Sequence, residues 1–200
     1  MSYRNRTSSN IIGYGLYLYF LGLSFRNTAK ALSFLKITKI SHVSIWKWIQ
    51  KYRPWKHLKN KKIQEYIIDE TAIKAGSELI WIWVVIEPTI KEILLFYISK
   101  ERNMFVAERV LSEVVNKYGL HSVSSDGGTW YPQACKFLKL KHRIHSFYEK
   151  NIIERTMQYV KDRTECFDDY FPCKKNKCKL NHIKQWFKLF IYEYNKEIIS

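Results

Sequence analysis

The stretch that decides the fold is "QEYIIDETAIKA", residues 64–75. Ile67 and Ile68 close an apolar run typical of a buried β-strand, and Asp69 and Glu70 follow at once. A carboxylate is costly to bury unless it is paired or binds a metal ion. We therefore expect Asp69 to lie at or near the end of a core strand, at a point where other acidic residues converge.

The pattern after residue 63 predicts a mixed-sheet α/β domain flanked by helices. Three strands follow one another closely, and then strands and helices alternate. The predicted strands are 63–73, 78–87, 91–99, 121–126 and 141–146, and the predicted helices are 104–118, 129–138, 151–165 and 181–197. We expect the aromatic side chains of the last helix to pack in a core rather than to stack on bases.

Two more acidic residues are expected at the same edge of the sheet. Asp126 ends the fourth strand, and Glu154 lies in the first turn of the predicted helix after the last strand. The first and fourth strands can be neighbours, so the three carboxylates would meet, and Gly127 and Gly128 let a phosphate approach. Three neighbouring carboxylates repel one another unless they bind cations. Oxygen ligands of this kind suit Mg²⁺ or Mn²⁺. Two ions are expected, because a pair of metal ions can stabilise both the attacking and the leaving oxygen of a displacement at phosphorus.

Basic residues are predicted beside this acidic cluster. Lys161 follows Glu154 by seven residues, two helical turns along the same face, where it can meet a DNA phosphate. Glu70 points to the opposite face of its strand from Asp69. There it is expected either to contact residues that surround the metal ligands or to face solvent. Other positive or titratable groups expected nearby are Arg155, His142, Arg143 and His145.

Positive charge is concentrated at the N-terminus. The 200 residues include 34 Lys and Arg against 18 Asp and Glu, a net charge of +16, and residues 1–62 hold thirteen of the basic residues and no acidic one. This favours a polyanionic partner, with DNA first and an anionic membrane second. Residues 7–25 are uncharged but contain three Gly and three Tyr, which favours a buried first helix over a membrane span.

Two short helices are predicted at 25–35 and 42–52, with Ser24 and Ser41 as caps. One face of the second helix is apolar. This arrangement is typical of a helix-turn-helix, although the connection is longer than usual, and the alternative is a small helical bundle with a solvated basic face. The residues expected to contact DNA from this helix are His42, Ser44, Lys47 and Lys51, with Arg155 expected to contact DNA from the second domain.

Pro54 and the polar segment 56–62 predict a linker. We therefore expect a small all-α helix-turn-helix domain over residues 1–58 and an α/β domain over residues 63–200. The chain shows no internal repeat.

The cysteines favour a reducing compartment. Without a secretion signal, Cys135, Cys166, Cys173 and Cys178 are expected to be free thiols in a cytoplasmic protein. The spacing of Cys173, Cys178 and His182 leaves a structural zinc site as an alternative, although it is looser than a paired-cysteine knuckle.

The motifs together resemble a DDE transposase of a bacterial or archaeal insertion sequence. They are "DET" at Asp69, "SDGG" at Asp126 and "NIIERTMQYVKDRT", which carries Glu154 and Lys161. The segments "GLSFRNTAKAL" and "SHVSIWKWIQKY" resemble the N-terminal domain of the same family, and "DRTECFDDYFPC" is most similar to archaeal members.

The resemblance implies a ribonuclease H-like catalytic domain and a function in DNA transposition. It implies that Asp69, Asp126 and Glu154 bind the metal ions and that Lys161 contacts DNA near the cleaved phosphate. It also implies strand cleavage at the terminal inverted repeats by activated water, followed by attack of a DNA 3′-hydroxyl on target DNA, within a dimer or larger assembly in the nucleoid.

Several alternatives remain at this point. Glu149 lies five residues before Glu154 and is a rival for the third acid, and the interval of 28 residues from Asp126 to Glu154 is shorter than usual for the family. The protein is alternatively a helix-turn-helix regulator, a nuclease or resolvase without strand transfer, or an inactive copy that still binds DNA.

Overall fold

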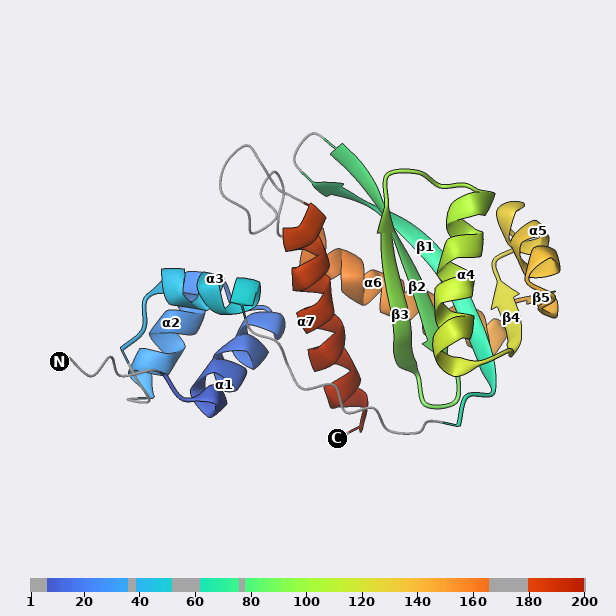
Figure 1. The fold of residues 1–200 in the computed structure, drawn as a ribbon. Helices are drawn as coiled ribbons and strands as arrows, with labels where there is room; N and C mark the ends of the chain where they lie inside the picture. Colours follow the sequence, from blue (N-terminus) through green and yellow to red (C-terminus); the bar gives the residue numbers. More distant parts are fainter. Residues whose placement is uncertain (1–6, 36–38, 52–61, 76–77, 166–179, 200) are drawn as a thin grey trace. The chain divides into compact units, whose positions relative to one another are not determined.

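The computed structural model describes residues 7–35, 39–51, 62–75, 78–165 and 180–199. They form two compact units (Figure 1), which are considered one at a time. The linker predicted around Pro54 lies largely outside the described residues. None of the helices in the described ranges is long and apolar enough to cross a membrane.

The N-terminal helices are short, and a serine side chain caps the start of each of the three. They are α1 (Ser9–Phe20), α2 (Phe25–Phe34) and α3 (His42–Lys51). The hydroxyl oxygen of Ser24 accepts the Asn27 N–H at 3.1 Å, and that of Ser41 accepts the Ser44 N–H at 3.3 Å, so both predicted caps are confirmed.

A glycine allows α1 and α3 to pack closely. A Cβ atom at Gly15 would lie 2.9 Å from the ring of Trp48. The position therefore excludes any side chain, because the indole occupies that space. Leu16, Ile45 and Ile49 are fully buried in the same unit, as expected for a buried first helix and for the apolar face of α3.

The first part of α7 (Leu180–Ile199) belongs to this same unit, up to Tyr194. Trp186, Phe187 and Phe190 are buried, and the indole of Trp186 stacks on the ring of Phe190 with centroids 5.2 Å apart. The prediction that the aromatic residues of the last helix pack in a core is confirmed.

The other unit contains a five-stranded mixed sheet with the strand order β3-β2-β1-β4-β5. β1 pairs antiparallel with β2 and parallel with β4, and β5 is parallel to β4. The predicted neighbourhood of the first and fourth strands is therefore confirmed. The strands are β1 (Glu65–Ala75), β2 (Glu78–Glu87), β3 (Glu92–Ser99), β4 (Ser122–Ser125) and β5 (His142–Ile144).

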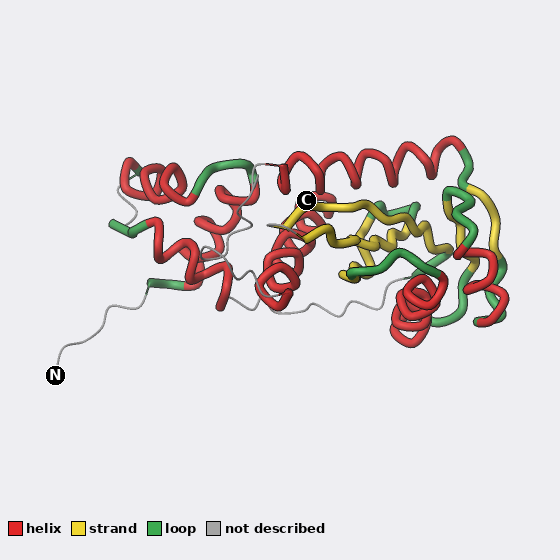
Figure 2. Tube along the Cα trace, turned by 90° about the horizontal axis from the view of Figure 1, so that it is seen from above, coloured by secondary structure: helices red, strands yellow, loops and turns green. Residues whose placement is uncertain are grey.

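Helices cover both faces of this sheet. α4 (Met104–Tyr118) and α5 (Trp130–Phe137) pack on one face, where Tyr66 and Ile68 of β1 join the buried apolar cluster. α6 (Phe147–Glu165) lies along the opposite face, as the view in Figure 2 shows. Residues of β1 thus alternate between the α4–α5 face and the α6 face.

Two element boundaries differ from the prediction. β1 ends at Ala75, two residues beyond the predicted end at residue 73, because its antiparallel pairing with β2 extends to the pair Ala75–Glu78. Asp69 therefore lies within the strand and not at its end. α6 begins at Phe147, four residues earlier than predicted, so Glu154 lies two turns into the helix and not in its first turn.

A capping box explains the early start of α6. Glu149 accepts the backbone N–H of Ser146 at 2.7 Å, and the Ser146 hydroxyl accepts the Glu149 N–H at 3.4 Å. A serine followed three residues later by glutamate is the sequence signature of this motif. The sequence interpretation missed it.

Candidate active site

Asp69 lies in β1, and Asp126 directly follows the parallel neighbouring strand β4. Ile67 pairs with Ser124, and each aspartate follows its member of that pair by two residues. Adjacent strands lie about 4.8 Å apart, and residues two apart share a face of the sheet. The alternation along β1 therefore places Asp69 on the face covered by α6, and Asp126, in the bend directly after β4, lies close enough for its charge to act on Asp69. Asp69 is half-buried and Asp126 is exposed.

The turn after β4 holds Asp126 in place. Its Oδ1 atom accepts the backbone N–H of Gly128 at 2.9 Å, and the Gly127 N–H donates to the Ser125 hydroxyl at 3.3 Å. Gly127 has a φ of 90°, a conformation that favours glycine. The glycine pair is thus required by the shape of the turn.

A pocket of about 460 Å³ brings Asp69 together with residues of α6. Glu154 and Lys161 both line it, as their seven-residue spacing predicts. Asp126 is not among the lining residues, although its charge acts on Asp69. The remaining lining residues are Glu70, Thr71, Arg155, Met157 and Gln158.

The electrostatics of Asp69 are those of a carboxylate crowded by other acids. Burial is the largest cause raising its pKa, and the charges of Glu70 and Asp126 raise it further. A hydrogen bond from the Glu70 N–H and the charge of Arg102 act in the opposite direction, and the pKa is about 7. A bound cation would remove this penalty, because it favours the ionised carboxylate.

Glu154 and Glu149 have different surroundings. Glu154 is exposed, and its Oε1 lies 3.8 Å from Lys150 Nζ, so its carboxylate is accessible. Glu149 is buried, accepts hydrogen bonds from Ser146, and forms an ion pair with Arg143. Burial by itself raises the pKa of Glu149, but these hydrogen bonds outweigh it and lower the pKa to about 2.

The basic groups predicted near the site divide into two kinds. Arg155 and Lys161 are exposed, and no ion pair found among the described residues involves either of them. Arg143 also pairs with Glu65 of β1, its Nη2 lying 2.5 Å from Glu65 Oε2. Arg143 thus ties β1, β5 and α6 together and is not available as a phosphate ligand.

The two histidines contact the serines of β4. His145 Nδ1 lies 2.9 Å from the Ser124 hydroxyl, and His142 Nε2 lies 2.9 Å from the Ser125 hydroxyl. Burial lowers the pKa of both rings. Both imidazoles are therefore neutral at pH 7, so they do not add to the positive charge expected there.

The surroundings of Glu70 exclude one of the two predicted positions. Its side chain is fully buried, so it does not face solvent, and Arg102 Nε donates to Glu70 Oε1 at 2.6 Å. Sequence reasoning missed Arg102. A buried glutamate predicts that some cationic partner lies nearby. Nothing in the sequence, however, specifies that the partner of Glu70 is an arginine 32 residues away.

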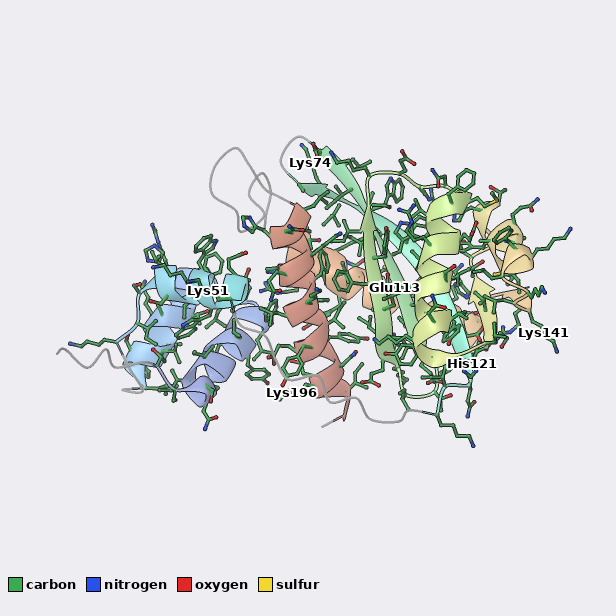
Figure 3. All side chains as sticks on the ribbon, viewed as in Figure 1. Lys51, Lys74, Glu113, His121, Lys141 and Lys196 are labelled. Atoms are coloured by element: carbon green, nitrogen blue, oxygen red, sulfur yellow. The ribbon has the colours of Figure 1, made fainter. Side chains whose placement is uncertain are left out.

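The predicted DNA-contacting residues of α3 do not all share one side of that helix: Lys47 and Lys51 lie about one turn apart on the same side, whereas His42 lies about two and a half turns before Lys51 and on the other side. His42, Lys47 and Lys51 are exposed, and Figure 3 shows Lys51 on the last turn of α3. Ser44 is half-buried, and its hydroxyl lies 3.2 Å from that of Ser41. Ser44 therefore takes part in the helix cap.

The structure does not test the predicted zinc site of Cys173, Cys178 and His182, because Cys173 and Cys178 lie outside the described residues. Cys166 lies there too. Cys135 is buried in α5 as a free thiol, and burial raises its pKa to about 11. It is therefore protonated and unreactive at neutral pH.

The acidic residues suit a divalent cation of the magnesium type. Within the described ranges, no three His, Cys, Asp or Glu side chains come close enough together to bind one ion. Mg²⁺ is usually held by one or two carboxylates, with waters and substrate phosphates completing its shell. Asp69 lines the open pocket, and Asp126 lies close enough for its charge to act on Asp69, so the two can supply this donor set, and their mutual repulsion favours a bound cation.

The strand order, the helices on both faces and the paired aspartates define a ribonuclease H-like domain. The catalytic core domain of BIV integrase has a similar fold, with a TM-score of 0.50 at 16% identity, over 68% of this chain and 86% of the integrase chain.

The chain belongs to the DDE domain family, DDE_Tnp_IS240, which its residues 63–190 match. It is also 33% identical over 197 residues to the uncharacterized protein MJ0017 of Methanocaldococcus jannaschii, a match that spans 96% of this chain and 88% of the relative. The family comprises transposases and integrases, which act on DNA by nucleotidyl transfer and generally use divalent metals.

Proposed function

We propose that this protein is a DNA transposase that cleaves DNA at the ends of an insertion sequence and joins those ends to a target. The observation that supports this most is the approach of Asp126, which directly follows β4, to Asp69 of β1, together with the pocket that brings Asp69 to Glu154 and Lys161 of α6. The family match over residues 63–190 makes polynucleotide chemistry the expected use of these residues.

In this proposal Asp69, Asp126 and Glu154 hold the divalent cations, two in number. When bound, such cations activate the attacking oxygen and stabilise the leaving oxygen of an in-line displacement at phosphorus. Glu149 is not assigned to this set, because its carboxylate is already used by Ser146 and Arg143.

Lys161 and Arg155 bind the DNA backbone beside the acids. Both are exposed, both line the pocket, and both side chains are positively charged. A phosphate held between these side chains and the carboxylate edge would be oriented for attack, which is the main contribution that a protein makes to phosphoryl transfer.

Two displacements at phosphorus make up the reaction. In the first, a water oxygen bonds to phosphorus, the bond to the 3′ oxygen breaks, and that oxygen takes a proton to become a 3′-hydroxyl. In the second, this 3′-hydroxyl loses its proton and bonds to a phosphorus of target DNA, whose own 3′ oxygen leaves. Neither step needs an oxidant or a nucleotide cofactor.

The N-terminal helices are assigned to recognition of the terminal inverted repeats. We propose that residues 1–58 form the DNA-binding domain, with α2 and α3 as a helix-turn-helix, and that residues 63–200 carry the catalytic domain, with the first part of α7 packed in the N-terminal unit. His42, Lys47 and Lys51 of α3 are exposed, and residues 1–62 carry no acidic residue. The two element ends require at least a dimer on DNA, and the proposal places the protein with the nucleoid in the cytoplasm.

Linear DNA carrying the sequences that flank the gene tests this proposal. The intact chain is incubated with this DNA and Mg²⁺ or Mn²⁺, and breaks are mapped at nucleotide resolution. We expect breaks at fixed flanking positions, their loss in Asp126→Asn and Glu154→Gln, and no loss in Glu113→Gln. Glu113 is an exposed glutamate of α4, on the other face of the sheet.

The same assay separates the alternatives. Specific binding without breaks, equal in the native chain and in Asp126→Asn, would identify a regulator or an inactive copy and would reject the proposed function. Breaks without ligation to target DNA would identify a nuclease and would reject the strand-transfer step alone.

A further inference from the structure

Glu70, next to Asp69 in β1, is a buried carboxylate with two partners. It points to the sheet face opposite Asp69, and its side chain has no exposed surface. Arg102 Nε donates to Glu70 Oε1 at 2.6 Å, and the hydroxyl of Tyr131 donates to Glu70 Oε2. A buried acid with a charged partner and a hydrogen bond is strongly fixed in position, because leaving either group unpaired is costly.

Two indole rings hold Arg102. Its guanidinium carbon lies 4.7 Å from the ring centroid of Trp81 and 4.2 Å from that of Trp130. A planar guanidinium that contacts two aromatic rings and a carboxylate at once has little rotational freedom. Arg102 lies just before α4, Trp81 lies in β2, and Trp130 begins α5.

Trp130 also packs against the turn that carries Asp126. A Cβ atom at Gly128 would lie 2.8 Å from the indole Cζ2, so the ring rests directly on the backbone there. The N–H of that same Gly128 donates to Asp126 Oδ1 at 2.9 Å. One guanidinium is therefore connected to both aspartate segments, through Glu70 to Asp69 and through Trp130 and Gly128 to Asp126.

We propose that Arg102 is a positioning residue that sets the spacing of the Asp69 and Asp126 carboxylates and, with it, their affinity for a divalent cation. Arg102, Glu70 and Trp130 are called the Arg102 clamp below. The inference rests on the proposed function, in which the two aspartates hold the cation. The clamp acts from the opposite face of the sheet and touches neither the cation nor DNA.

Direct binding of Mn²⁺ to the full-length chain, without DNA, tests the clamp. Free Mn²⁺ is followed by electron paramagnetic resonance during titration, so catalysis does not enter the readout. The variants are Arg102→Met, Arg102→Lys and the double variant Glu70→Gln with Arg102→Met. The matched control is Arg109→Met, because Arg109 is an exposed arginine of α4 whose Nη1 contacts the Tyr97 hydroxyl at 3.3 Å.

Outer-shell groups of metal sites typically change metal affinity by about 10- to 100-fold. We expect a weakening of that size for Arg102→Met and a smaller one for Arg102→Lys, which keeps the charge but removes the planar stacking on the indoles. The double variant removes the unpaired buried charge, so it should recover stability while Mn²⁺ binding stays weak. Arg109→Met should bind as the native chain does.

Circular dichroism and melting temperature establish which variants are folded. If Arg102→Met does not fold, the Mn²⁺ affinities of Arg102→Lys and of the double variant test the proposal instead. Native-like Mn²⁺ affinity in a folded clamp variant, together with its loss in Asp126→Asn, would overturn the inference and leave the proposed cation site standing. A native chain that binds no Mn²⁺ would overturn both.

Discussion

Trp186 donates its indole N–H to the hydroxyl of Tyr19 at 3.0 Å, although 167 residues separate the two in the sequence. Phe20 lies beside the same indole, with ring centroids 5.4 Å apart. A residue near the end of the chain therefore completes the core of the N-terminal unit. The helices before residue 52 do not make that core alone.

Replacing Trp186 with alanine should unfold the N-terminal unit more easily. Loss of a buried Trp side chain costs about 3–5 kcal/mol of unfolding free energy. Trp186 is fully buried, whereas Phe34 is 86% exposed, so Phe34→Ala is a matched control expected to change stability by less than about 0.5 kcal/mol. Urea unfolding followed by circular dichroism measures both.

The interaction between Trp186 and α1 also predicts the behaviour of a fragment that begins at residue 63. Such a fragment keeps Trp186, Phe187 and Phe190 but lacks the α1 residues that cover them, so it should bind a hydrophobic dye more strongly than the intact chain. Equal stability of Trp186→Ala and the native chain, or no extra dye binding by the fragment, would contradict this account of α7.

Glu154→Gln and Glu149→Gln should have opposite effects. Glu154 is exposed, so its substitution should leave the melting temperature nearly unchanged and abolish metal-dependent cleavage. Glu149→Gln should lower stability by about 1–2 kcal/mol, because it removes a charged hydrogen-bond acceptor beside a half-exposed arginine, and should leave measurable cleavage. Cleavage abolished only in Glu149→Gln would make Glu149 the third acid.

The stability contributed by Glu149 should depend on pH in a defined direction. Its pKa is about 2 in the folded protein against an ordinary value of 4.5, so the folded state favours the ionised form. This contribution is complete above pH 4.5 and is lost as the pH falls from 4.5 through 2. The difference in melting temperature between the native chain and Glu149→Gln should therefore close over that range. A melting-temperature difference that stays constant from about pH 6 to about pH 3 would show that the ion pair between Glu149 and Arg143 does not cause that difference.

The mixed sheet, the neighbouring first and fourth strands and the approach of Asp69 to Asp126 were predictable from the sequence. Three strands followed by alternation leave few arrangements, and glycines after a strand that ends in aspartate are a strong local signal. Ser24 and Ser41 marked the starts of two helices correctly, because N-caps depend on one or two residues.

The errors come from interactions between residues distant in the sequence or from a motif that was overlooked. Asp69 lies within β1 and not at or near its end, because β1 pairs with β2 as far as Ala75, and periodicity within β1 alone does not show this pairing. The Ser146–Glu149 capping box was visible in the sequence and was missed. The partner of Glu70 depends on the position of a loop 32 residues away, which no local pattern specifies.

Lys47 and Lys51 should each contribute to the salt dependence of DNA binding. Removing one lysine–phosphate interaction reduces the slope of log K against log salt by about 0.9, since one fewer counterion is released. We expect Lys47→Gln and Lys51→Gln to reduce the slope by about this amount, and Lys196→Gln to leave it unchanged.

Figure 3 shows Lys51 on α3 and Lys196 on α7, and all three lysines are exposed. Fluorescence anisotropy with duplex DNA from 50 to 300 mM salt, about the range over which such binding changes steeply, gives the slopes. Equal slopes for Lys51→Gln and Lys196→Gln would place the DNA-binding surface elsewhere on the protein.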